Sequence, residues 1–301
     1  MRQLEGIFPA AATPINQDGS PDSPTLVSHC KALLKDGCDG IALLGSTGEA
    51  NSFGISERQN ILEQVVAGGI DPNQLIPGTA QSNVTDTVTL TRLAVDMGVR
   101  AVVLLPPFYY KGVTDEGLYR AFSEVIDKVA NSQLKIILYH IPHLSGIGIS
   151  QALINRLKSA YPNTIVGVKD SSGDLENMRQ TLNQCPDISV LAGADPLMLP
   201  LLKMGGSGCI TATSNLLPGD LRFVFDNWNN SDMEREVEAS QRRICSWREL
   251  TNSYTQLPTV KAMLAKKRNK ESWMLVRPPF VELTEVERSA LWLKMDQLAQ
   301  Q

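Results

Sequence analysis

The sequence lacks the features that would direct it to a charged partner or to a membrane. Its 301 residues hold 28 Lys and Arg against 32 Asp and Glu, a formal net charge of −4. Without a basic excess, nothing favours nucleic acid or an anionic membrane surface as a partner. No apolar run approaches the roughly 20 residues of a membrane span, and residues 1–6 open no apolar signal segment. We therefore expect a cytoplasmic protein with neither nucleic acid nor membrane as its partner.

Cysteine and histidine are too scarce and too scattered to indicate a disulfide framework or a metal site. The five cysteines, at positions 30, 38, 185, 209 and 245, form no CxxC pair, and three histidines are present. An odd number of scattered cysteines argues for a reducing compartment and against a structural zinc site. His140 and His143 share a short motif without a carboxylate at a diagnostic spacing. We predict no metal ligands here and interpret both histidines as hydrogen-bonding groups.

What the chain does have is a repeated alternation of short apolar runs with helix-length amphipathic segments. Most runs are continuous rather than alternating, as in parallel strands covered on both faces. The expected strands are residues 7–11, 40–44, 75–78, 101–105, 135–140, 165–169, 189–192 and 208–211. About eight such units in roughly 220 residues indicate a (β/α)8 barrel. The competing doubly wound sheet would more often show a glycine-rich phosphate turn after its first strand, where this chain has Ala12-Thr13-Pro14.

Helices are expected between these strands and, without further strands, after about residue 227. A capping-box pattern places one helix start at Ser56, with Gln59 three residues on. The other expected helices are residues 23–34, 85–97, 115–129, 150–157, 175–182, 233–254, 257–265 and 284–299. We therefore predict a barrel over residues 1–227 and a helical extension packed on it over residues 228–301.

One lysine ends an apolar strand. In IVGVKDSSGD, residues 165–174, Lys169 follows directly on Val168. A buried lysine loses hydration, which disfavours its charged form, and a neutral amine can attack a carbonyl to form a Schiff base. In a barrel this strand end would face the active site, and Tyr139, at the preceding strand end, could shuttle protons. A lysine here is more often a solvated loop residue and a tyrosine more often a core residue, so the pattern leaves both interpretations open.

The segment GSTGE at residues 45–49 could hold a carboxylate. It offers the hydroxyls of Ser46 and Thr47 and backbone N–H groups close to a helix start. By itself it is equally a turn that precedes a helix. Together, these two hydroxyls, the amine of Lys169 and the phenol of Tyr139 indicate a site for an α-keto acid. Asp170 and Asp174 are interpreted as a cap and a first-turn charge of the next helix.

These motifs together resemble one family. They include GSTGE (45–49), PPFYYK (106–111), YHIPHLSG (139–146), GVKD (167–170), AGAD (192–195), GCITATSN (208–215) and LPTVKAML (257–264). In this order and spacing they resemble the class I pyruvate aldolases, the family of N-acetylneuraminate lyase and dihydrodipicolinate synthase. The resemblance covers nearly the whole chain. It implies a (β/α)8 barrel with a C-terminal helical extension.

The resemblance also implies roles for individual residues. Lys169 looks like the Schiff-base lysine and Tyr139 like the tyrosine that relays protons. Ser46 and Thr47 look like the pair that binds the pyruvate carboxylate, together with Gly45, and that links the tyrosines by hydrogen bonds, so Ser46 and Tyr110 are counted with Lys169 and Tyr139 as catalytic residues. The covalent imine on Lys169 would make any cofactor unnecessary.

Two further roles follow from the resemblance. Tyr110 looks like the tyrosine that a neighbouring subunit inserts into the site, and family members are usually homotetramers built as dimers of dimers. The main-chain carbonyl of Ile210 looks like the group that faces the lysine. The implied partners are therefore small molecules and further copies of the chain.

Departures from the family pattern narrow the expected substrate. Synthases usually carry arginine where this chain has Leu144, and threonine where it has Ser46. Sialic acid lyases usually carry glutamate at Pro196 and serine at Ala212. What remains is a 2-keto-3-deoxy or 4-hydroxy-2-keto acid. The candidate contacts for its hydroxyls or distal carboxylate are His143, Asp195, Thr211 and Thr213.

The leading hypothesis is a lyase that cleaves such an acid to pyruvate and an aldehyde, or forms it in reverse. A dihydrodipicolinate synthase or a keto-deoxy sugar-acid dehydratase would use the same Schiff base. A non-catalytic barrel that binds keto acids is a further alternative, because fold alone does not fix function. An intact lysine, tyrosine and hydroxyl pair argues against it.

Overall fold

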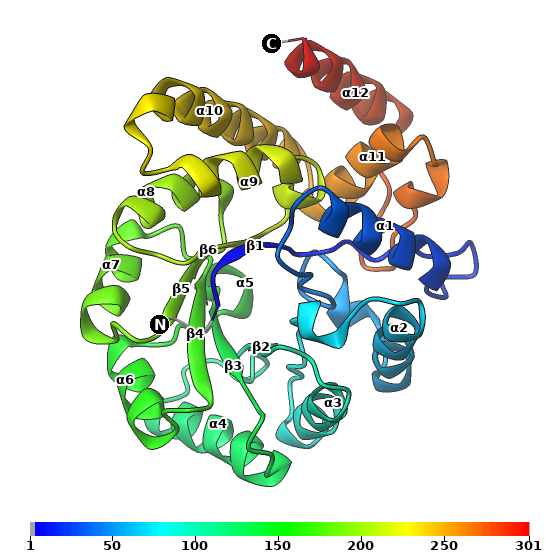
Figure 1. Cartoon of the computed structure of the whole chain (residues 1–301). Helices are drawn as coiled ribbons and strands as arrows, with labels where there is room; N and C mark the ends of the chain where they lie inside the picture. Colours follow the sequence, from blue (N-terminus) through cyan, green and yellow to red (C-terminus); the bar gives the residue numbers. More distant parts are fainter. Residues whose placement is uncertain (1–3, 301) are drawn as a thin grey trace. The chain divides into compact units, whose positions relative to one another are not determined.

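The structure, a computed structural model, describes residues 4–300, which fold into two compact units (Figure 1). Of the described residues, unit 1 contains 4–6 and Asp71–Ile210, and unit 2 contains Ile7–Ile70 and 211–300. The expected domain division into 1–227 and 228–301 stays a prediction. Within residues 4–300 no helix is both long and apolar enough to cross a membrane.

A parallel sheet forms the centre of unit 1. Its strands are β2 (Val102–Leu104), β3 (Ile136–His140), β4 (Ile165–Asp170), β5 (Ser189–Ala192) and β6 (Gly208–Thr211). They lie side by side in the order β6-β5-β4-β3-β2, and all their residues are buried except the half-buried His140. The start of β1 (Gly6–Pro9) joins the β6 edge where Gly6 N donates to Ser207 O at 2.8 Å. Burial on both faces explains why these runs are continuous rather than alternating.

Helices alternate with the strands of unit 1 and cover the sheet (Figure 1). They are α3 (Val84–Asp96), α4 (Asp115–Val129), α5 (Pro142–Ser145), α6 (Gln151–Ala160), α7 (Leu175–Gln184) and α8 (Met198–Lys203). The helix α4 occupies the range expected from the sequence. Thr114 caps it by accepting from Gly117 N, and Leu118, Phe122 and Val125 form its buried face. A capped start and apolar residues three and four apart therefore set both its range and its orientation.

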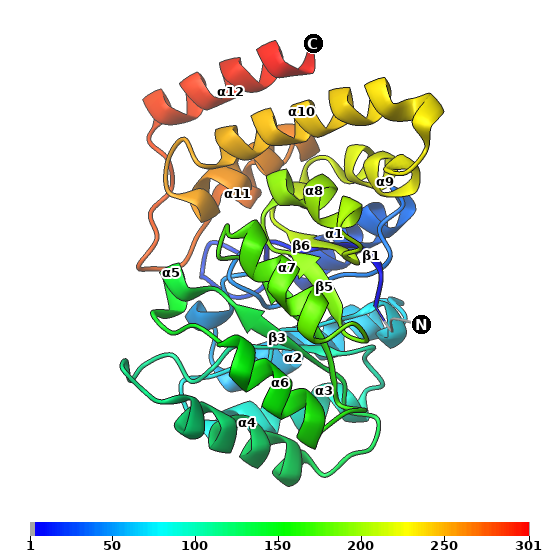
Figure 2. The ribbon, with the colours of Figure 1, turned by 90° about the vertical axis from the view of Figure 1, so that its left-hand side faces the viewer.

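Unit 2 combines two segments that are distant in sequence. Ala10 N donates to Thr211 O at 2.9 Å, which ties the two segments together, and Ala11 N donates to Ala42 O at 3.0 Å within the first segment. The helices of this unit are α1 (Ser23–Lys35), α2 (Ile55–Ala67), α9 (Pro218–Asn227), α10 (Glu234–Thr251), α11 (Gln256–Arg268) and α12 (Glu285–Ala299). Figure 2 shows α12 lying along α10.

Short 3-10 helices lie between the longer elements. They are η1 (Ala50–Ser52), η2 (Pro72–Gln74), η3 (Asp195–Leu197), η4 (Thr213–Asn215), η5 (Ser231–Met233) and η6 (Glu271–Met274). Two of them, η3 and η4, follow directly on β5 and β6 with at most two residues between. These turns therefore shape the carboxyl ends of those strands.

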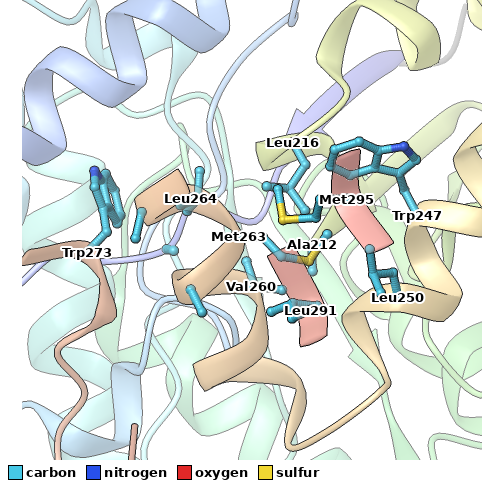
Figure 3. Close-up of a cluster of buried hydrophobic side chains, with 13 residues drawn as sticks. Ala212, Leu216, Trp247, Leu250, Val260, Met263, Leu264, Trp273, Leu291 and Met295 are labelled. Atoms are coloured by element: carbon cyan, nitrogen blue, oxygen red, sulfur yellow. The ribbon is translucent and has the colours of Figure 1, made fainter. Parts of the chain in front are cut away.

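An apolar core holds the C-terminal helices of unit 2 together (Figure 3). Its larger side chains are Leu216, Trp247, Leu250, Met263, Leu264, Trp273, Leu291 and Met295. Ala12 and Ala212 belong to the same cluster. Because α10, α11 and α12 all contribute, each helix buries its apolar side against the others and against the ends of two barrel segments.

Two of the expected strands are reduced to isolated bridges. Ala42, in the segment 40–44, forms a bridge with Ala10, and Gly78, in the segment 75–78, forms a bridge with Val103. In the first segment Leu44 adopts a left-handed conformation with φ 54°, which ends the extended backbone. The capping box of α2 is also shifted: Gly54 is the N-cap and Glu57, rather than Gln59, accepts from its backbone N–H.

A buried histidine connects three elements of unit 2. His29, 3% exposed, donates through Nε2 to Asn215 Oδ1 at 2.9 Å, and Arg268 Nη2 lies 3.2 Å from its Nδ1. Its ring meets Trp273 edge to face, with 5.0 Å between the ring centroids. Burial lowers the pKa of His29 to about 4, against the raising effect of Asn215, and Arg268 and Lys267 lower it further.

This histidine should make stability fall in mild acid. Above pH 6.5 it is neutral in both states, whereas between pH 6.5 and about 4 only the unfolded chain takes up the proton. The free energy of unfolding should therefore drop by about 3 kcal/mol across that window. Urea unfolding at a series of pH values measures this drop. His29→Gln keeps a donor and an acceptor but does not titrate, so an unchanged slope in that variant would contradict the assignment.

Candidate active site

The structure brings Lys169 and Tyr139 together at the carboxyl ends of two neighbouring strands. They are register partners on β4 and β3, and Lys169 Nζ lies 4.0 Å from the centroid of the Tyr139 ring. Lys169 is 5% exposed and Tyr139 is 4% exposed. Continuous apolar runs place both side chains within the sheet rather than on the surface. The alternative of a solvated loop lysine is therefore wrong.

Asp170 shows which face of the sheet Lys169 occupies. Its carboxylate accepts from Ser172 N at 2.8 Å and from Asn177 Nδ2, on α7, at 2.7 Å. Successive side chains of a strand point to opposite faces. Because Asp170 faces α7, Lys169 points to the opposite face. Asp174 is the N-cap of α7, accepting from Glu176 N at 2.9 Å, so both aspartates serve the start of this helix.

Two histidines, His140 and His143, follow Tyr139 in the sequence. His140 Nδ1 accepts from Ile149 N at 3.0 Å, and burial lowers its pKa although Asp170 and Asp174 act in the opposite direction. His143 is exposed in α5, beside Leu144, which is 65% exposed. Among residues 4–300, no group of three or more His, Cys, Asp or Glu is arranged to hold a metal ion.

The loop after β2 carries Tyr110 on the surface of unit 1. Tyr110 is 73% exposed and meets Tyr109, 71% exposed, edge to face with 5.2 Å between ring centroids. Lys111 Nζ donates to Phe108 O and, at 2.5 Å, to Ser145 O. The ammonium therefore ties this loop to the turn after β3 and fixes the base from which Tyr110 projects.

Asp195 and Ile210 also lie at strand ends of unit 1. Asp195, the first residue of η3 after β5, is fully buried, and Ile210 on β6 is 1% exposed. Both positions follow the rule that parallel strands present their carboxyl ends at one edge.

Unit 2 holds the predicted carboxylate site in one turn. Glu49 N donates to Ser46 O at 3.2 Å and Ala50 N donates to Gly45 O at 3.2 Å, which closes residues 45–50 into a compact loop. Ser46 is exposed and Thr47 is half-buried. The loop therefore presents both hydroxyls while its backbone turns back on itself.

Thr211 and Thr213, also in unit 2, are more enclosed. Thr211 is 1% exposed, and its Oγ1 lies 3.1 Å from Ser214 Oγ, which itself donates to Thr211 O at 2.6 Å. Thr213 has no exposed surface. Contact of Thr211 or Thr213 with a substrate stays a prediction.

A buried ion pair that the sequence motifs did not indicate lies at the end of the 45–49 loop. Lys261 Nζ lies 2.5 Å from Glu49 Oε1, and both side chains are 0% exposed. Burial lowers the pKa of Lys261, against the raising effect of Glu49. The signal was present in the sequence, because Lys261 stands alone among Val260, Ala262 and Met263 just as Lys169 stands in its strand.

Unit 2 also contains a pocket of about 330 Å³ that is separate from the predicted site residues of this unit. Its lining residues are Pro24, Thr25, Ser28, His29, Ala32, Arg268, Lys270 and Trp273. None of the predicted site residues lines it. The predicted site residues therefore lie at the strand ends and in the 45–49 loop rather than around this pocket.

Comparisons with known proteins found relatives over nearly the whole length of the chain. An uncharacterized DapA-like lyase of Chloroflexus aurantiacus is 33% identical over 292 residues, which are 97% of this chain and 96% of the relative. A 4-hydroxy-tetrahydrodipicolinate synthase of Bacillus subtilis is 30% identical over 283 residues, 94% of this chain and 95% of the relative.

Solved structures match at the level of the fold. Dihydrodipicolinate synthase from Agrobacterium tumefaciens superposes with a TM-score of 0.90 at 30% identity, covering 97% of this chain and 99% of that one. YagE, an Escherichia coli K12 prophage protein solved in complex with pyruvate, gives a TM-score of 0.89 at 26% identity and 98% coverage of both chains. These likenesses confirm the predicted fold class, a (β/α)8 barrel with a C-terminal helical extension. The model of the dihydrodipicolinate synthetase family matches residues 3–298, and the chain belongs to that family.

Proposed function

We propose that the protein is a pyruvate-dependent Schiff-base aldolase or lyase that acts on a 2-keto-3-deoxy or 4-hydroxy-2-keto acid. The observation that carries the proposal is the buried amine of Lys169, 4.0 Å from the ring centroid of Tyr139 on the neighbouring strand. A buried lysine beside a phenol suits imine chemistry, which needs a nucleophile and a proton relay at one place. A member of the family solved with pyruvate supports the same substrate class.

In the proposed reaction the deprotonated Lys169 amine attacks the keto carbon. The carbinolamine gains a proton on oxygen and loses water to give a protonated imine. Cleavage of the bond between C3 and C4 of the acid releases an aldehyde as the C4 hydroxyl loses its proton, and the electron pair is held as an enamine. Protonation of the enamine carbon and hydrolysis of the imine release pyruvate and restore the amine. No cofactor is needed, because the imine is the electron sink.

The proposal assigns Tyr139 to the proton relay. Removal of its hydroxyl in Tyr139→Phe should lower kcat by about 10²–10⁴-fold, the usual contribution of a positioned acid or base. The ring beside Lys169 is retained, so the fold and the lysine environment should be preserved. Steady-state kinetics with the cleaved acid measure the effect. Full activity in Tyr139→Phe would assign the relay to another group.

The remaining roles follow the family pattern. Gly45, Ser46 and Thr47 are proposed to bind the carboxylate through hydroxyl and backbone donors, since anions suit such turns. The main-chain carbonyl of Ile210 is proposed to accept from the Schiff-base nitrogen or the water it releases. His143 and Asp195 are proposed as contacts for the distal part of the acid.

Leu144 favours the lyase over the synthase. Leu144 is uncharged and 65% exposed, and it occupies the position where synthases usually carry a carboxylate-binding arginine. The synthase nevertheless stays a second candidate, because the relative from Bacillus subtilis carries that name at 30% identity. A keto-deoxy acid dehydratase would use the same lysine without carbon loss.

Product analysis separates these candidates. Incubation with a series of 2-keto-3-deoxy acids should release free pyruvate if the protein is a lyase. A keto acid that keeps all its carbons indicates a dehydratase. Growth of a diaminopimelate auxotroph on the cloned gene, without pyruvate release from any acid, would instead establish the synthase.

The protein is further proposed to act in the cytoplasm as a homotetramer, a dimer of dimers. The exposed pair of Tyr109 and Tyr110 supports a partner subunit, because large exposed aromatic side chains mark interfaces. The cysteines are free thiols in the structure, which suits a reducing compartment. Sedimentation equilibrium measures the assembly, and a monomer at micromolar concentration would refute the tetramer.

A further inference from the structure

The loop that presents Ser46 and Thr47 is bounded by two residues in an unfavourable backbone conformation. Leu44 has φ 54° and Glu49 has φ 55°, both in the left-handed region that side chains other than glycine rarely adopt. Gly48 sits between them, and a Cβ there would come within 2.9 Å of Ala11 O. Such a backbone persists only where its surroundings hold it in place.

The contacts that hold the loop converge on its last two residues. Glu49 Oε1 lies 2.5 Å from Lys261 Nζ on α11, and Glu49 Oε2 accepts from Arg277 N at 3.0 Å. Thr13 Oγ1 donates to Gly48 O at 2.8 Å. All of these residues belong to unit 2. Both carboxylate oxygens of Glu49 are therefore engaged, each by a different segment of the C-terminal region.

The Glu49–Lys261 pair is not an ordinary stabilising contact. Removing two charges from water costs several kcal/mol per ion, and apolar residues in their place are often equally or more stable. A fully buried pair is therefore weak support for stability alone. The pair does fix geometry. A short charge-assisted contact sets the position of the Glu49 carboxylate and, with it, the position of the loop backbone.

We infer that Glu49, held by Lys261 and by the Arg277 backbone, is a positioning residue that sets the carboxylate-binding geometry of Ser46 and Thr47. The inference rests on the proposed function. It assigns a task to helix α11, which would hold the loop that carries Ser46 and Thr47 within unit 2. The residues that touch substrate remain Ser46 and Thr47, and Glu49 acts through them.

The test replaces the pair by apolar residues of similar size, Glu49→Leu together with Lys261→Met. The readout is borohydride trapping of the pyruvate adduct on Lys169 over a range of pyruvate concentrations. We expect the half-saturating pyruvate concentration to rise about tenfold to a hundredfold, the range for loss of hydrogen bonds to a charged group. Trapping at saturating pyruvate should stay within about threefold of the unsubstituted protein, because the lysine and its relay are untouched. An unchanged half-saturating concentration overturns the inference.

Two further variants keep the test decisive. Glu49→Gln alone preserves shape and an acceptor for Arg277 N, and it should still raise the half-saturating concentration at least about threefold. Lys266→Met is the matched control on the same helix, since its Nζ pairs with Asp296 at 2.6 Å on α12 rather than with the loop; it should leave pyruvate binding unchanged. If the unsubstituted protein forms no adduct at all, the proposed function fails. If it does, and Glu49→Gln and the double variant bind pyruvate normally, the positioning role alone fails.

Discussion

Replacement of Lys169 by alanine should lower pyruvate-dependent activity by about 10³-fold or more, as expected when a covalent nucleophile is removed. The buried amine beside Tyr139 is the group that the proposed reaction cannot replace. Lys169→Arg should be as inactive, because a guanidinium stays charged at any working pH and cannot form the imine. Activity is measured as pyruvate release, and the fold of each variant is checked by its thermal melt.

Borohydride trapping tests the proposed role of Lys169 directly. With pyruvate, peptide mass spectrometry across residues 165–179 should find a reduced pyruvyl adduct on Lys169, and none in Lys169→Ala. Lys203→Ala is the control, since this lysine is exposed at the end of α8 and has no role in the proposal. Retention of full aldol activity in Lys169→Ala would remove the Schiff base from the mechanism. Pyruvate binding without a covalent trace in the folded protein would favour the non-catalytic keto-acid barrel.

Lys261→Met alone should destabilise the protein by about 3–5 kcal/mol, because it leaves a carboxylate buried without its counter-ion. Glu49 would keep the N–H of Arg277 as a hydrogen-bond partner but would lose the ammonium of Lys261. The free energy of unfolding in urea, measured at pH 7 without substrate, gives the effect.

A second substitution, at Glu49, shows whether an unpaired buried charge or lost packing causes the loss of stability. Adding Glu49→Leu should restore most of the stability, since the uncompensated charge is then gone. Lys266→Met, which breaks the more exposed pair with Asp296, should cost about 1 kcal/mol or less. A double variant as unstable as Lys261→Met would show that the packing of the methylene chain, rather than the ion pair, is what matters.

Local patterns in the sequence were sufficient for many elements. The helix α4 and the strands β5 and β6 occupy their expected ranges. The helix has a capped start and apolar residues three and four apart, and each strand is a short apolar run with a glycine at one end, so these limits can be predicted from neighbouring residues. Segments 40–44 and 75–78 were harder, because a strand also depends on its partners and on the backbone of residues such as Leu44.

The sequence by itself determined the family, the barrel class and the candidate residues Lys169, Tyr139, Ser46 and Thr47, because these follow from motifs and from apolar runs. Tertiary structure alone decided that Lys169 is buried against the Tyr139 ring, since that depends on the register between β3 and β4. It also decided that Glu49 and Lys261, 212 positions apart, form a buried pair. Contacts over such distances arise only when the chain folds back on itself, and no local pattern of charge or hydrophobicity specifies which buried acid meets which buried base.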